Sequence, residues 1–101
     1  MWAQLIRMRM KPGSEEQFEQ LGRRWEEEVG RGTDSGWLEA HLFRNAHDPD
    51  EWYQVVYFES EEKARQNERN PKHQELLEPL LALMNGEPEF VDLIPAMQQT
   101  R

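Results

Sequence analysis

The segment Trp52 to Phe58, which reads WYQVVYF, is apolar or aromatic at every position except Gln54. A continuous run of this kind predicts a strand in the middle of a sheet, because both of its faces must be covered. The segments 2–10 and 37–44 alternate instead, which is typical of strands with two different faces. One face of the first segment carries Trp2, Gln4, Ile6, Met8 and Met10. One face of the second carries Trp37, Glu39, His41 and Phe43.

Two helical stretches separate these strands. Ser14 and Gln17 have the spacing of a capping box, and an apolar stripe follows at helical spacing, made by Phe18, Leu21, Trp25 and Val29. Ser60 is the expected N-cap of the second stretch. The pair Asn70 and Pro71 interrupts that stretch, and helical residues continue to Met84. A last strand is expected from about residue 89 to residue 94.

The order strand, helix, strand, strand, helix, strand is βαββαβ, the plan of a ferredoxin-like α+β fold. It predicts an antiparallel four-stranded sheet with helices on one face, in one domain over residues 1–95 with a C-terminal tail over 96–101. The other face of the sheet then needs a cover for apolar groups drawn from Leu5, Leu38, Leu42, Val55 and Tyr57. A twofold contact with a second copy is the commonest solution, so a homodimer is expected.

Composition narrows the range of partners. Twenty acidic and twelve basic side chains give a net charge of -8, which repels phosphate backbones and anionic membrane surfaces. Neither nucleic acid nor a membrane is therefore an expected partner. The chain has no cysteine, which fits a reducing compartment, and its first residues resemble neither a signal peptide nor a membrane span. We expect a cytoplasmic protein.

Four segments resemble the antibiotic biosynthesis monooxygenase family. They are the strand end Met10-Lys11-Pro12-Gly13, the strand start Gly36-Trp37-Leu38, the junction from Tyr57 to Ala64, and above all Asn70-Pro71-Lys72-His73-Gln74. The resemblance spans most of the chain. It implies a dimeric α/β barrel, in which two ferredoxin-like protomers pair their sheets and each keeps a pocket between its own sheet and helices.

Within that family, the resemblance implies either oxygenases that need no bound cofactor and oxidise phenols or quinols with O2, or haem-degrading enzymes. The haem degraders carry an asparagine, a tryptophan and a histidine ligand where this chain has Ile6, Asn67 and Leu77. Leucine cannot ligate iron, so neither haem nor another cofactor is expected. A metal site is not expected either, because His47, Asp48 and Asp50 lack a preorganised third ligand.

A cofactor-independent oxygenase needs a dry aromatic cavity, a base or hydrogen-bond donor, and room for O2. The candidates are His73 as base or proton donor and Asn67 as donor to a developing oxyanion. Gln4, Ile6, Trp25 and Phe58 are the expected substrate-binding walls. Each also has an ordinary structural explanation: His73 as a helix-start residue, Asn67 as an exposed helix residue and Trp25 as core. A non-catalytic small-ligand-binding or stress-related homodimer of the same fold is therefore the alternative, and whether the chain is an enzyme stays open.

Overall fold

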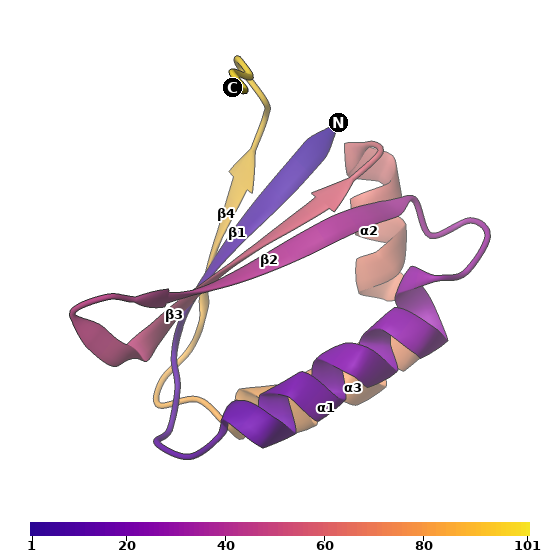
Figure 1. Cartoon of the computed structure of the whole chain (residues 1–101). Helices are drawn as coiled ribbons and strands as arrows, with labels where there is room; N and C mark the ends of the chain where they lie inside the picture. The colour runs from indigo at the N-terminus through magenta and orange to yellow at the C-terminus, as the bar shows by residue number, and fades with distance from the viewer.

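The computed structural model describes all residues from 1 to 101. It contains a four-stranded antiparallel sheet in the order β2-β3-β1-β4, with its helices on one face, as the sequence predicts (Figure 1). The strands are β1 (Trp2–Arg9), β2 (Trp37–Asn45), β3 (Asp48–Phe58) and β4 (Glu89–Leu93). The helices are α1 (Glu15–Trp25), a π-helical turn η1 (Glu26–Gly30), α2 (Glu61–Arg69) and α3 (Pro71–Leu81).

The sheet places the WYQVVYF segment between two neighbours, β1 and β2, so its central position is confirmed. Helices α1 and α3 lie side by side below the sheet in Figure 1, and α2 stands at the end where β2 begins. Gln4 pairs with Val56 and Asp92, and Ile6 pairs with Gln54 and Phe90. These pairs face the helices, as the alternation in β1 predicts.

A β-bulge at the start of β2 overturns part of the predicted facing. Trp37 pairs with Phe58, but Glu39 already pairs with Tyr57, so the register shifts by one residue between them. Because an extra residue reverses the alternation, Trp37 faces the helices and not the side of Glu39. Leu42 also faces the helices, since it pairs with Gln54, and Leu38 lines the helix side.

The apolar set predicted for the uncovered face is therefore only partly right. Leu5, Val55 and Tyr57 lie there, whereas Leu38 and Leu42 do not. Phe43 and Leu93 join the face, and 55% and 37% of their surfaces are exposed. The uncovered face thus has Phe43 and Leu93 in place of the predicted Leu38 and Leu42.

The N-cap predicted for α2 is confirmed, the capping box predicted for α1 is not, and α3 has an N-cap at Asn70 that was not predicted. Ser60 Oγ accepts a hydrogen bond from the Lys63 amide, and Asn70 Oδ1 accepts one from the Lys72 amide. Ser14 makes no cap bond with its side chain. Its hydroxyl donates instead to the carbonyl of Lys11 at 2.7 Å, so the predicted capping box is wrong and Ser14 closes the preceding turn.

Helix α3 ends at Leu81, three residues before the predicted end, although Pro79 lies within it. The chain after the helix pairs with the end of β1: Leu83 accepts a hydrogen bond from the Lys11 amide, and the Asn85 amide donates to Arg9. Met84 also forms an isolated antiparallel β-bridge with Met10. These backbone groups find partners in the sheet, and the helix stops for that reason.

The hydrophobic core sits beneath the end of the sheet where β1 finishes. It consists of Met8, Met10, Phe18, Trp52 and Met84, and the rings of Phe18 and Trp52 meet edge to face at 5.3 Å. Beyond this core the space between sheet and helices is not filled, and the site lies there. None of the helices has the length and hydrophobicity of a membrane-spanning segment. The last strand ends at Leu93, and residues 96–101 carry no regular structure.

Candidate functional site

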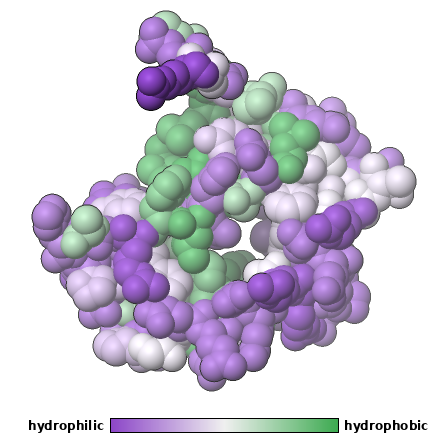
Figure 2. All heavy atoms as spheres, in the orientation of Figure 1, coloured by the Kyte–Doolittle hydropathy of each residue, from purple (hydrophilic) through white to green (hydrophobic).

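A cavity of about 710 Å³ lies between the sheet and the helices, and 17 of its 28 lining residues are hydrophobic. Figure 2 shows it as a hollow between the two layers, with hydrophobic surface along one side. A cavity of this size and character is typical of sites for small, largely apolar ligands. All six residues selected from the sequence line it: Gln4, Ile6, Trp25, Phe58, Asn67 and His73.

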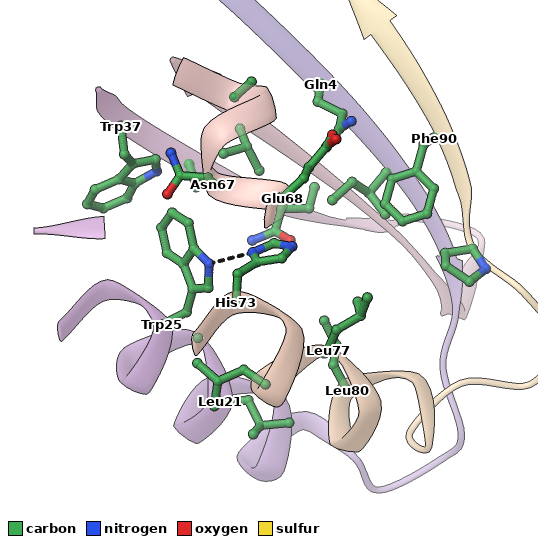
Figure 3. Close-up of a pocket in the computed structure, with 18 of the residues that line it drawn as sticks. Gln4, Leu21, Trp25, Trp37, Asn67, Glu68, His73, Leu77, Leu80 and Phe90 are labelled. Carbon is green, nitrogen blue, oxygen red and sulfur yellow. Dashed lines mark hydrogen bonds between the residues drawn. The ribbon is translucent and has the colours of Figure 1, made fainter. Parts of the chain in front are cut away.

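His73 and Trp25 meet in the wall made by α1 and α3. The indole Nε1 of Trp25 donates a hydrogen bond of 3.0 Å to Nδ1 of His73, and the rings stand edge to face (Figure 3). Burial lowers the pKa of His73 from its ordinary value of 6.5, while the nearby charge of Glu68 acts in the opposite direction. Burial therefore favours the neutral form of His73.

Asn67 is buried at the same end of the cavity, but its amide nitrogen is fully engaged. Nδ2 donates to the carbonyl of Ser35 at 2.7 Å and to the carbonyl of Lys63 at 2.9 Å. Two carbonyl partners identify this atom as the nitrogen, since an oxygen could not donate. No N–H of Asn67 remains for the donor role expected from the sequence. The side chain can offer only its oxygen to a ligand.

Trp37 completes an aromatic wall that the sequence analysis missed. Its ring packs edge to face on Trp25 at 5.5 Å, and both rings line the cavity. The indole nitrogen of Trp37 is buried and has no hydrogen-bond partner. The bulge puts this side chain in the site. To place Trp37 in the cavity from the sequence, the bulge itself would have to be predicted, and the glycine-rich segment before it is the one indication of it.

Charged side chains gather at another part of the cavity wall. Arg65 contacts three carboxylates, at 2.8 Å from Asp92, 2.9 Å from Glu68 and 3.3 Å from Glu61. Gln4 donates to the other oxygen of Asp92 at 3.3 Å. The hydrogen bond from Arg65 lowers the pKa of Asp92. The spacing of Arg65 from Glu61 and Glu68 is visible in the helix sequence, but the contact with Asp92 depends on β4.

The other histidines lie outside the cavity. His41 contacts Glu39 at 3.2 Å on the opposite face of the sheet, and His47 lies in the turn between β2 and β3. No group of three or more histidine, cysteine, aspartate or glutamate side chains is arranged to hold a metal ion. The cavity wall offers one imidazole, one guanidinium, amide groups, indoles and carboxylates.

Comparison with known proteins places this architecture. A sequence model described as antibiotic biosynthesis monooxygenase matches residues 1–79. A search of curated proteins with the sequence gives no match. Several solved structures share the fold.

A variant of SnoaB, a cofactor-independent oxygenase from Streptomyces nogalater, superposes with a TM-score of 0.83 and 15% identity, covering 99% of this chain and 97% of that one. A Nitrosomonas europaea protein named for the same family superposes with a TM-score of 0.77 and 14% identity, covering 96% of this chain and 100% of that one. A conserved protein from Methanosarcina mazei superposes with a TM-score of 0.77 and 16% identity, covering 92% of this chain and 91% of that one. At these identities the likeness is one of fold.

Proposed function

The chain belongs to the antibiotic biosynthesis monooxygenase family, and from this premise we propose that it is a cofactor-independent monooxygenase that oxidises a small aromatic or quinol-type substrate with O2 in the cavity. The observation that carries the proposal is the composition of the cavity wall. Two indoles packed edge to face and a mostly apolar lining surround one imidazole whose pKa is lowered by burial. Such a wall suits a flat aromatic ring with an oxygen substituent.

The reaction that we propose balances without a further reductant. A phenol and one O2 give a quinone and one water: one oxygen atom enters the ring, and the other leaves with two hydrogens from the substrate. The ionised phenol supplies the electrons, since its negative charge is spread onto ring carbons. The protein then has to bind the ring, stabilise charge on the phenolic oxygen and exclude water.

We assign the residues accordingly. His73 contacts the oxygen on which negative charge develops, and Trp25, Phe58, Gln4 and Ile6 form the walls. Asn67 presents its amide oxygen as an acceptor, because both of its N–H groups are engaged. The catalytic roles of His73 and Asn67 belong to this proposal.

The decisive experiment is oxygen uptake with hydroquinones and hydroxylated naphthalenes and anthracenes. We expect turnover in the absence of added metal or flavin, and a loss of about 10²-fold or more in His73→Gln if the imidazole stabilises the oxyanion. His47→Gln is the matched control, because His47 is an exposed histidine of the hairpin turn. An equal rate for the His73 variant and the wild type would remove His73 from the mechanism.

The alternative is a small-ligand-binding homodimer without catalysis, which in the cell could serve a stress-related role. It is favoured by one observation: the polar groups of the cavity are largely paired within the protein, including the amide of Asn67 and Nδ1 of His73. Tight binding of an aromatic ligand, seen as quenching of the cavity tryptophans, with no oxygen uptake across the panel would support this function over the enzyme.

We further propose that the protein is a homodimer that packs the uncovered sheet faces together. Leu5, Val55 and Tyr57 lie on this face with the exposed rings of Phe43 and His41. Val55→Asp should reduce the mass measured by light scattering to that of one protomer. The control is Gln54→Asp, which puts the same charge one residue earlier on the opposite face of β3. A dimer that survives Val55→Asp would contradict this interface.

The cytoplasm is the location that we propose. The basis is the absence of cysteine from the chain, since secreted domains of this size often depend on disulfides. Fractionation of cells expressing a tagged chain would test the location, and recovery in the periplasm or medium would contradict it.

A further inference from the structure

The hydrogen bond between Trp25 and His73 restricts which form the imidazole can take. An indole nitrogen is a donor only, because its lone pair belongs to the ring system. Its partner, Nδ1 of His73 at 3.0 Å, must therefore be the unprotonated, accepting nitrogen. A neutral imidazole carries one N–H. In His73 that hydrogen is consequently on Nε2.

The protonated form of the ring is disfavoured at the same place. With a hydrogen on Nδ1, two N–H groups would point at each other, and Trp25 would lose its acceptor inside the protein. Burial already lowers the pKa of His73, and Glu68 is the one charged group that opposes this shift. Geometry and desolvation thus favour the same neutral form.

Trp25 itself is held in place by its neighbours. The ring of Trp37 packs against it from β2. The backbone of Gly30 lies so close that a Cβ atom there would be 2.7 Å from Cζ3 of Trp25. The indole is therefore confined between the end of the π-helical turn η1 and the bulged strand, and its N–H keeps a fixed direction.

From these contacts we propose that Trp25 is a positioning residue that holds His73 as the neutral Nε2–H form, so that His73 donates a hydrogen bond into the cavity and does not act as a general base. The nitrogen of His73 that faces away from Trp25 is turned toward the middle of the cavity (Figure 3). The part of this inference that concerns a substrate rests on the proposed function. The form of the imidazole in the free protein does not.

This assignment specifies what the cavity recognises at that point. An Nε2–H group requires an acceptor, so the ligand must place a carbonyl or phenolate oxygen against His73. Because His73 donates here, the proton that a phenolic ligand loses must go to another group. Asp92 is engaged by Arg65 and Gln4, whereas Oε2 of Glu68 has no partner in the protein and lines the same cavity. Glu68 pairs with Arg65 through Oε1, and its Oε2 is the atom that we assign to that task.

Nitrogen-15 NMR of the imidazole rings tests the proposal on the free protein at neutral pH. We expect His73, assigned by comparison with His73→Gln, to show a protonated Nε2 and a hydrogen-bonded, unprotonated Nδ1. In Trp25→Phe the signals should move toward the mixed tautomers of a free imidazole, and the pKa of His73 should rise. The control is Trp2→Phe, which removes a buried indole N–H that bonds to nothing and should leave the His73 signals unchanged.

A protonated Nδ1 in the wild-type protein overturns the proposal even if Trp25→Phe does not fold. Unchanged His73 signals in a folded Trp25→Phe protein overturn it as well. The readout needs no substrate, so it is separate from the proposed function. The expected tautomer with no oxygen uptake would support the inference and count against the enzyme. Oxygen uptake with a protonated Nδ1 would support the enzyme and overturn the inference.

Discussion

The side-chain nitrogen of Asn67 lies 2.7 Å from the carbonyl oxygen of Ser35 and ties α2 to the loop that leads into β2. The same nitrogen also reaches the carbonyl of Lys63, one turn earlier in its own helix. Because Asn67 is buried, removing it leaves the Ser35 carbonyl without this donor. The residue therefore has a structural task whatever its part in binding.

Asn67→Ala should accordingly lower the free energy of unfolding by about 1–3 kcal/mol, the usual cost of leaving buried polar groups unpaired. Urea denaturation followed by tryptophan fluorescence measures it. Gln66→Ala, at an exposed position of the same helix, should change stability by less than about 0.5 kcal/mol. If both variants were equally stable, the bond to Ser35 would contribute nothing, and activity changes in Asn67→Ala could be read as catalytic.

Two glycines near the cavity should respond oppositely to alanine. Gly22 lies within α1, and a Cβ there would meet no atom within 4 Å, so Gly22→Ala should stabilise the protein by up to about 1 kcal/mol through helix propensity. At Gly30 the new methyl group would press on the rings of Trp25 and Trp37. Gly30→Ala should therefore destabilise it, and thermal melts of the two variants should bracket the wild type.

The lowered pKa of His73 makes stability depend on pH. Its ordinary value is 6.5, and burial in the folded protein lowers it, so the unfolded chain takes up a proton first as the pH falls. His73 should thus destabilise the fold progressively below about pH 6.5, with no effect above it, until the pH passes the lowered pKa. The difference between urea curves of the wild type and His73→Gln isolates this term. A difference independent of pH would show that burial does not perturb the ring.

The charge of the cavity should select among ligands. Glu26, Glu68 and Asp92 line it, and Arg65 is the one lysine or arginine that does. Because Arg65 is already paired with three carboxylates, an added carboxylate on a ligand would find repulsion and no free cation. A naphthoquinone should therefore bind more tightly than its carboxylated analogue. The difference in affinity between the two ligands should decrease at high ionic strength. Fluorescence titration can measure both affinities. Tighter binding of the acid would contradict this reading.

Much of the fold follows from local patterns. Alternation and helical spacing predicted the order and type of every element except the short π-helical turn. The cap at Ser60 was also predictable, because it depends on a residue only three positions away. The six expected cavity residues also converge. They do so because strand faces and helix stripes turn toward the same space once the sheet forms.

The sequence by itself determined the βαββαβ order, the acidic surface and the side chains of β1 that face the helices. Only the tertiary structure decided how those side chains are used. The bulge that turned Trp37 inward, the carbonyls that engaged Asn67, and the indole that occupied Nδ1 of His73 all depend on residues from other elements. Periodicity reports which way a residue faces along its own element. Hydrogen-bond partners and charge states depend on what the folded chain places against it.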